Sequence, residues 1–274
     1  MRLSVLSSGS SGNATYMETD SGGLLVDAGL SRRRIEALLV RIGRTLGDVQ
    51  AILLTHGHSD HTCGVRSLVR DRGIRVFAAP GVGESLGAGT VAPGEKCKVG
   101  GLTATFFEVP HDSLTYGVRI SDEASAVAMA TDLGEAGIDV LRCMRGAEAV
   151  ILEANHDHDW LRRGPYAASL KRRISSRHGH LSNRQAGEAA VALAPHGLKD
   201  IVLAHLSKTN NSPIRASGTV HRALREAGHS GVRVKAAIAG QPTPWIEVGT
   251  PLRAPEHVYR YDKMDAAGQL FGID

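Results

Sequence analysis

The chain has 274 residues and a mass of 29.0 kDa, with 42% hydrophobic and 22% charged residues. This size and composition suit one large folded domain and argue against a disordered chain. Three cysteines argue against a disulfide framework, and no apolar run reaches the roughly 18 residues of a transmembrane helix. The cysteine usage favours a reducing compartment, and the N-terminal apolar stretch is too short for a signal-peptide core, so the chain is expected to be cytoplasmic and to bind no membrane.

The N-terminal part of the chain predicts short strands followed by a strand–helix alternation. Apolar runs predict strands over 3–6, 14–18 and 23–26, with the polar sequence Ser7–Asn13 between the first two. Ser31 is a suitable N-cap for a helix that runs to about Ile42. The run Val49–Leu54, apolar except for Gln50, is typical of a buried strand. A helix over 63–71 and a strand over 76–78 follow.

The rest of the chain repeats this pattern. Strands are predicted over 103–109, 116–120, 126–130, 149–152, 200–203 and 232–238. Helices are predicted over 136–144 and 214–227, and over 156–194 with breaks at Gly164–Pro165 and Gly179. The proline-containing tail from Gln241 predicts an irregular surface segment. Strands in two runs with helices between them favour an α/β fold with two sheets and helices outside.

A histidine-rich loop follows the apolar strand that ends at Leu54. It reads Thr-His-Gly-His-Ser-Asp-His and contains His56, His58, Asp60 and His61. Imidazole nitrogens and carboxylate oxygens are the ligands that zinc, manganese and iron accept. A loop at a strand end can direct several side chains to one point, so the sequence predicts a metal site here.

Further candidate ligands also follow apolar strands. These residues are Asp27, His111, Asp132 and His205. Sheets of α/β proteins commonly place their sites at the carboxyl ends of strands. Each residue alone could have a structural role, but their order along the chain around the histidine-rich loop favours one shared site.

This order of motifs resembles the metallo-β-lactamase superfamily over roughly residues 1–240. The resemblance implies a four-layer αββα sandwich, with a catalytic domain over 1–245 and a C-terminal extension over 246–274. A closer similarity is to the YycJ/WalJ group of metal-dependent nucleases and phosphodiesterases. The segments that carry it are Leu6–Asn13, Asp27–Ser31, Glu153–Asp157, Gly164–Tyr166, Leu170–Ile174 and Gly179–Asn183. At 111–116 the chain lacks the proline that usually precedes the aromatic residue.

The resemblance implies two divalent ions, Zn²⁺ or Mn²⁺, and a role for each candidate ligand. It implies one ion at His56, His58 and His111, and a second at Asp60, His61 and His205. It also implies that Asp132 bridges the ions and that Asp27 orients a ligand imidazole through a hydrogen bond. A hydroxide shared by the two ions would attack phosphorus. His180 is expected to donate a proton to the leaving oxygen or a hydrogen bond to a phosphoryl oxygen. The expected catalytic residues are therefore His180, Asp60 and Asp132.

Candidate substrate contacts lie between residues 155 and 183. They are Asn155, His156, Arg172, Arg173, Ser182 and Asn183. Basic side chains beside a phosphodiester-cleaving centre could hold a nucleic-acid backbone. Three alternatives stay open: Ser182 could be only a helix N-cap, His156 could be a surface residue, and part of the basic stretch could be solvated surface.

The function that these features imply is a metal-dependent phosphodiester hydrolase, with DNA or another phosphodiester as its partner and substrate. The resemblance favours a 5′-to-3′ DNA exonuclease. The alternatives are a small-molecule phosphodiesterase of the phosphoribosyl 1,2-cyclic phosphate type and another hydrolase of the same fold. The low aromatic content of 4% does not support a long base-stacking platform. The sequence indicates no oligomeric state.

Overall fold

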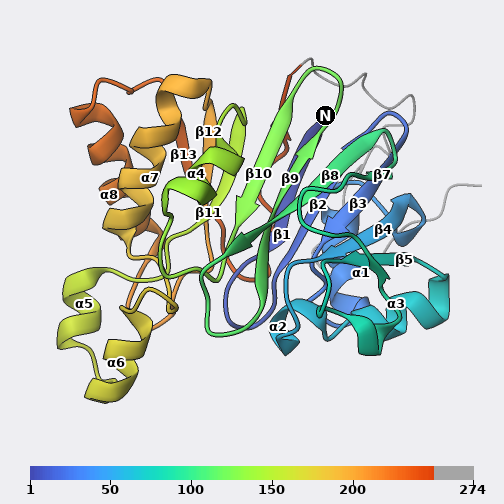
Figure 1. The fold of residues 1–274 in the computed structure, drawn as a ribbon, viewed down its shortest axis with the longest axis horizontal. Helices are drawn as coiled ribbons and strands as arrows, with labels where there is room; N and C mark the ends of the chain where they lie inside the picture. Colours follow the sequence, from blue (N-terminus) through green and yellow to red (C-terminus); the bar gives the residue numbers. More distant parts are fainter. Residues whose placement is uncertain (250–274) are drawn as a thin grey trace, which may run out of the picture.

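A computed structural model describes residues 1–249 and shows two seven-stranded sheets packed face to face, with helices on the outer face of each (Figure 1). This arrangement is the predicted α/β fold with αββα layers. Among the helices of residues 1–249, none combines the length and apolar character that a membrane span requires.

The first sheet has the strand order β14-β1-β2-β3-β4-β5-β6. Strands β1 to β3 pair antiparallel, whereas β3 to β6 pair parallel. The bounds are β1 (Arg2–Ser7), β2 (Ala14–Thr19), β3 (Gly22–Val26), β4 (Val49–Leu54), β5 (Arg75–Ala78), β6 (Gly89–Thr90) and β14 (Ile246–Glu247).

The second sheet has the order β13-β12-β11-β10-β9-β8-β7 and the same change of pairing. Strands β7 to β10 are antiparallel, and β10 to β13 are parallel. The bounds are β7 (Cys97–Val99), β8 (Leu102–Val109), β9 (Thr115–Ser121), β10 (Ala126–Ala130), β11 (Ala149–Glu153), β12 (Asp200–Ala204) and β13 (Arg233–Ala236).

Helices cover the outer faces of both sheets (Figure 1). On the first sheet these are α1 (Arg32–Arg41) and α3 (Val65–Arg72), and on the second they are α4 (Ile138–Met144), α7 (Asn183–Leu193) and α8 (Pro213–Glu226). The short helices α5 (His158–Arg163) and α6 (Ala168–Ile174) project beside the second sheet. Three short 3₁₀ turns, η1 (Leu46–Asp48), η2 (Glu84–Leu86) and η3 (Ala194–His196), complete the described elements.

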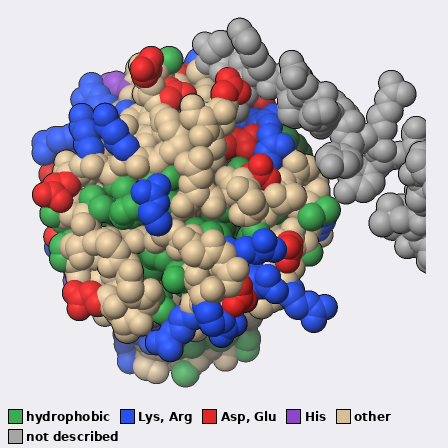
Figure 2. Space-filling model, turned by 90° about the vertical axis from the view of Figure 1, so that its right-hand side faces the viewer, with side chains coloured by type: hydrophobic (Ala, Val, Ile, Leu, Met, Phe, Trp, Pro, Cys, Tyr) green, Lys and Arg blue, Asp and Glu red, His purple; other side chains and the backbone are tan. Residues whose placement is uncertain are grey.

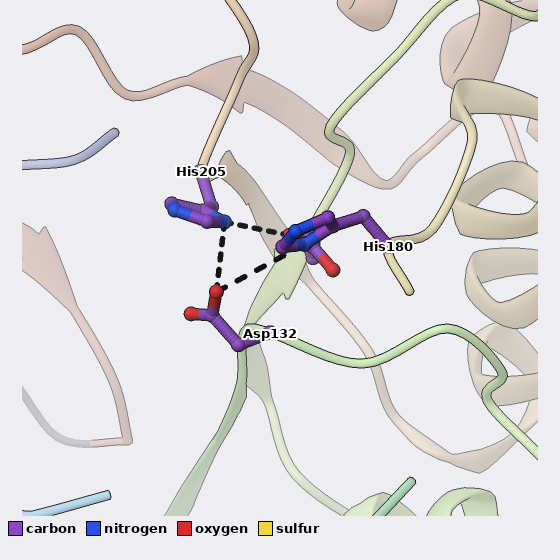
Figure 3. Close-up of side chains that lie close together, drawn as sticks. Asp132, His180 and His205 are labelled. Atoms are coloured by element: carbon purple, nitrogen blue, oxygen red, sulfur yellow. Dashed lines mark hydrogen bonds and ion pairs between the residues drawn. The ribbon is translucent and has the colours of Figure 1, made fainter. Parts of the chain in front are cut away.

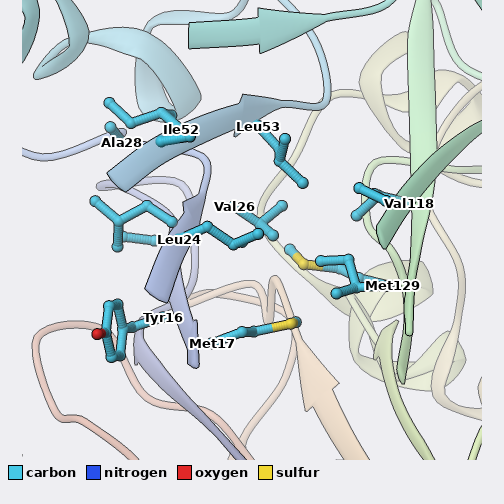
Figure 4. Packing of buried hydrophobic residues seen from close by; sticks show 14 of the residues in the cluster. Tyr16, Met17, Leu24, Val26, Ala28, Ile52, Leu53, Val118 and Met129 are labelled. Carbon is cyan, nitrogen blue, oxygen red and sulfur yellow. The ribbon is translucent and has the colours of Figure 1, made fainter. Parts of the chain in front are cut away.

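Two apolar layers hold the molecule together. The first lies between the sheets, where Met17 and Val26 face Val118 and Met129 of the opposite sheet (Figure 4). The second lies between the second sheet and its helices, and includes Leu152, Leu203 and Val220. Because β4, β10, β11 and β12 are buried on both faces, their sequences are continuous apolar runs.

Several predicted elements differ from the structure. The helix expected over 63–71 is α3, which runs over Val65–Arg72. A further short helix that was not predicted, α2 (Ser59–Thr62), lies within the histidine-rich loop. The strand expected over 232–238 is the short edge strand β13, and β7 was not predicted. The tail is not wholly irregular, because Ile246 is buried in β14 beside β1. The rest of the predicted extension, residues 250–274, lies outside the described residues.

Candidate metal centre

The loop after β4 brings three imidazoles together. Its first half is extended and its second half is α2, so His56 and His61 point inward and are fully buried, while His58 is exposed. The ring centres of His56 and His61 are 4.0 Å apart, and those of His56 and His58 are 4.7 Å apart. His111, which follows β8, lies 6.1 Å from His56 and 5.9 Å from His58 by the same measure.

Three site residues at strand ends share an unusual backbone conformation. Among the described residues, the non-glycine residues with positive φ are Asp27 (60°), Asp132 (58°) and His205 (54°). Each follows the carboxyl end of a parallel strand: β3, β10 and β12. This region is costly for residues with a Cβ atom, and such residues gather at functional sites. The conformation turns the three side chains toward the edge where the two sheets meet.

Asp132 lies at the centre of the cluster. One carboxylate oxygen is 3.2 Å from Nε2 of His61, and the other is 3.3 Å from Nδ1 of His205. Asp60 reaches both imidazoles from the other side, with its Oδ2 3.7 Å from Nε2 of His61 and 3.8 Å from Nε2 of His205. Figure 3 shows Asp132 and His180 converging with His205 at this point. The structure therefore brings together the seven predicted ligands.

The donor atoms in this cluster fit divalent metal ions. Nε2 of His56, Nε2 of His205 and Oδ2 of Asp132 are buried and make no hydrogen bond within the described residues. A buried polar atom without a partner is costly unless something else satisfies it. Because these atoms are imidazole nitrogens and a carboxylate oxygen, divalent metal binding accounts for them.

Asp27 fixes the orientation of His61. Its Oδ2 accepts a hydrogen bond from Nδ1 of His61 at 2.8 Å, and its Oδ1 accepts one from the backbone N–H of Thr55 at 2.9 Å. Asn13 contacts the other ring nitrogen of His61 through its side-chain amide, at 2.9 Å. Because Asp27 is fully buried, rotation of the His61 ring would leave a buried carboxylate without this hydrogen bond.

Glu153 is a functional residue that the sequence analysis did not assign. One carboxylate oxygen accepts hydrogen bonds from Nδ1 of His205 at 2.7 Å and Nδ1 of His180 at 2.9 Å. The other accepts backbone N–H groups of Leu133 at 3.0 Å and Leu181 at 3.2 Å. The available signal was its place as a carboxylate at the end of an apolar strand, which Asp27 and Asp132 share.

Burial and the neighbouring charges shift the pKa values of the imidazoles in this site in opposite directions. Burial lowers the pKa of His56 to about 4. Burial also acts to lower the pKa of His61, but the charges of Asp27 and Asp132 outweigh it and raise that pKa to about 10. For His180, burial is likewise outweighed by the Glu153 carboxylate, and the pKa is raised. The Glu153 carboxyl itself has a pKa of about 2, because the attraction of His180 and His205 outweighs its burial.

The predicted substrate contacts fall into different environments. Asn155 donates to the backbone carbonyl of His205 at 2.9 Å, and Asn183 donates to Asn211. Ser182 is the N-cap of α7, and its hydroxyl donates to Gln185 at 2.7 Å. His156 is buried, with 2% of its surface exposed, so the surface alternative is wrong. Its Nδ1 makes no hydrogen bond within the described residues.

The two arginines predicted to contact substrate lie on α6 and are exposed. Arg173 forms an ion pair of 3.3 Å with Asp112, the neighbour of His111, and so stands at the rim of the metal centre. Arg172 makes no ion pair among the described residues.

The two facing sheets, with a histidine and aspartate cluster at one edge, define a metal-dependent hydrolase fold. Residues 23–206 match the family model described as the Beta-lactamase superfamily domain. The exodeoxyribonuclease WalJ of Streptococcus pneumoniae is 38% identical over 239 residues, which are 82% of this chain and 89% of that protein. The exodeoxyribonuclease YycJ of Bacillus anthracis is 35% identical over 83% of this chain and 90% of its own length. The chain therefore belongs to the metallo-β-lactamase superfamily, in the group that includes WalJ and YycJ.

Solved structures agree with the fold. The metallo-β-lactamase-fold protein YhfI from Bacillus subtilis superposes with a TM-score of 0.63 at 19% identity, over 88% of this chain and 98% of that chain. The Zn²⁺-bound protein PqqB from Methylobacterium extorquens gives 0.65 at 21% identity, over 89% and 100% of the two chains. The predicted superfamily and the αββα architecture are thus confirmed.

Proposed function

We propose that this chain is a dinuclear metal-dependent exonuclease that hydrolyses DNA phosphodiester bonds from the 5′ end. The observation that carries the proposal is the 38% identity to a protein named as an exodeoxyribonuclease, across 82% of this chain. The convergence of seven histidine and aspartate side chains at one sheet edge supports the hydrolytic part of the proposal.

Two sets of side chains would hold the ions, Zn²⁺ or Mn²⁺. The first set is His56, His58 and His111, and the second set is Asp60, His61 and His205. Asp132 would be shared, because its carboxylate lies 3.2 Å from His61 and 3.3 Å from His205 of the second set, and within 4.8 Å of a ring nitrogen of His56 of the first set. Bound divalent ions supply Lewis acidity and lower the pKa of bound water.

His180 is proposed as the proton donor to the leaving oxygen. Its Nδ1 is engaged by Glu153 at 2.9 Å, so only Nε2 is left to reach a substrate. The ring centre lies 5.3 Å from those of both His111 and His205, which places it between the two sets. Because the Glu153 carboxylate raises the pKa of His180, the imidazolium form is available near neutral pH.

Helix α6 is proposed to hold the DNA backbone. None of its residues is buried, and it projects from the body of the molecule with α5 (Figure 1). Part of the basic stretch is neutralised locally, because Arg162 pairs with Asp159 and Arg177 pairs with Glu135. Arg172 makes no ion pair among the described residues. Arg173 pairs with Asp112 but keeps 67% of its side chain exposed beside the metal centre, so both arginines are proposed as phosphate contacts. On the face that Figure 2 presents, Lys and Arg side chains are instead scattered among acidic and apolar ones.

The test is a cleavage assay with purified protein, loaded with Mn²⁺ or Zn²⁺. The substrates are DNA labelled at one end, single- and double-stranded, and a cyclic phosphate ester. Stepwise release of nucleotides from the 5′ end, weakened by salt, is the expected result. An Asp132→Asn protein prepared in parallel controls for contaminating nucleases. Fast turnover of the cyclic ester without DNA cleavage would replace the proposal with a small-molecule phosphodiesterase.

A further inference from the structure

A pocket of about 440 Å³ adjoins the metal centre on the side of His205. Three loops form it: Ser8 and Gly9 after β1, residues 206–213 after β12, and residues 237–239 after β13. The backbone N–H of His205 donates to the hydroxyl of Ser8 at 2.7 Å, and Leu206 of the pocket wall is the next residue in the chain. The pocket therefore lies next to the backbone of His205, a member of the second set of ligands.

One side of the pocket offers hydrogen-bond donors for an anion. The hydroxyl oxygen of Ser207 accepts the backbone N–H groups of Thr209 and Asn210, and that of Ser212 accepts the N–H of Arg215. Because their oxygens already act as acceptors, both hydroxyls keep a proton to donate. Lys208 is exposed and makes no ion pair within the described residues. No carboxylate lines the pocket, so its charge favours a phosphate.

The other side of the pocket is apolar. Leu206, Pro213, Ala237 and Ile238 line it, and Ile238 is 41% exposed although it is aliphatic. Sites for small organic molecules combine such apolar walls with a few polar groups and have volumes of about 300–1,000 Å³. The size and the two-sided chemistry of this pocket match one nucleotide, with a charged phosphate and a flat base.

We propose that this pocket binds the 5′-terminal nucleotide of the DNA strand, with the terminal phosphate at Lys208, Ser207 and Ser212 and the base against Ile238. The inference rests on the proposed function and adds the origin of end specificity. A strand without an end cannot place a terminal phosphate in the pocket. Holding the end next to the metal centre directs hydrolysis to the first phosphodiester bonds.

The test measures DNA binding separately from cleavage. Affinities are measured in the Asp132→Asn background, which leaves the DNA intact, for single-stranded oligothymidylate in three forms: linear with a 5′-phosphate, linear with a 5′-hydroxyl, and circular. We expect the 5′-phosphorylated form to bind best. Lys208→Glu should weaken that form at least about tenfold, the scale of a lost charge-assisted hydrogen bond, and remove its advantage over the other two.

Ile238→Asp should weaken both linear forms and leave the circular form unchanged. Two substitutions of the same kind serve as matched controls: Lys98→Glu, on the exposed edge strand β7, and Ile138→Asp, which is 70% exposed at the start of α4. Neither control should alter the preference for the 5′-phosphorylated end.

The outcomes separate this inference from the proposed function. If Lys208→Glu weakens linear and circular DNA equally, Lys208 is a general backbone contact and the pocket proposal is wrong. If it leaves DNA binding unchanged but raises KM for a cyclic phosphate ester, the pocket serves a small substrate and the proposal is again wrong. If the end preference depends on Lys208 but the metal-loaded wild type degrades no DNA, the pocket stands and the exonuclease assignment fails.

Discussion

The two ligand sets differ in what holds their imidazoles in place. In the second set, Nδ1 of His61 donates to the buried carboxylate of Asp27, and Nδ1 of His205 donates to the buried carboxylate of Glu153. In the first set, Nδ1 of His56 lies 3.1 Å from a threonine hydroxyl, and that of His111 lies 3.1 Å from the backbone carbonyl of Gly179. His58 is exposed and makes no side-chain hydrogen bond among the described residues.

If the cluster holds the two proposed ions, this difference predicts that it binds them with unequal affinity. A carboxylate behind an imidazole orients the ring and makes it a more basic ligand, whereas a neutral oxygen does so weakly. The charges act in the same direction, since the carboxylates around His61 raise its pKa to about 10 while burial lowers that of His56 to about 4. We therefore expect the second set to bind its ion more tightly than the first.

Removal of the shared carboxylate should have the largest effect. Asp132→Asn removes a charge that lies 3.2 Å from His61 and 3.3 Å from His205 of the second set, and within 4.8 Å of a ring nitrogen of His56 of the first set, so both sets are expected to lose a ligand at once. Turnover of DNA is expected to fall below detection, and metal content to fall below that of the wild type. Cleavage assays and elemental analysis measure the two effects. Substantial residual activity would mean that the sets do not depend on a common residue.

The next largest effect is expected for His180→Ala, which separates proton transfer from metal binding. His180→Ala should lower kcat by about 10² or more, the usual scale for a lost general acid, while the metal content stays at the wild-type value. His180 has its Nδ1 on Glu153 and 18% of its side chain exposed, which suits a group that meets substrate. Loss of an ion in this variant would make His180 a ligand and remove its proposed role.

Glu153→Gln should have a smaller effect, but on two quantities, the metal affinity and kcat. Its carboxylate serves His205 of the second set and also His180, so both metal affinity and kcat should decrease. Loss of such a supporting carboxylate typically costs about 10–100-fold in metal affinity or activity. Asp27→Asn is the matched comparison, because Asp27 supports His61 and makes no contact with His180. Asp27→Asn should lower the metal affinity alone. If it lowers kcat at saturating metal as much as Glu153→Gln does, the two carboxylates do not differ in the way proposed.

Much of this site was predictable because its residues follow apolar strands. The run Val49–Leu54 and the histidine-rich loop after it predicted a buried strand and its metal-binding end, and Asp27, Asp132 and His205 were found by the same logic. The fold followed from the two runs of strands. Short edge strands such as β7 and β13 were missed or overextended, because half-exposed residues leave no continuous apolar run.

Other features depend on contacts between distant segments. Glu153 was visible as a carboxylate at a strand end, but only the fold shows that His180 and His205, 27 and 52 residues away, share one of its oxygens. The pocket beside His205 draws on three loops that are far apart in the sequence.

The smallest expected effect tests whether the two ligand sets differ in metal affinity. Graded chelation of the Mn²⁺-loaded protein should remove one ion per chain at a chelator concentration about tenfold lower than the other, the lower end of the range for supporting carboxylates. His58→Ala identifies which ion leaves first: it should carry one ion per chain, and that ion should show the tighter of the two wild-type affinities. Metal content measured across the titration gives both values. If the ions leave together, or if the ion kept by His58→Ala is the weaker one, the buried carboxylates of Asp27 and Glu153 do not set the order of binding.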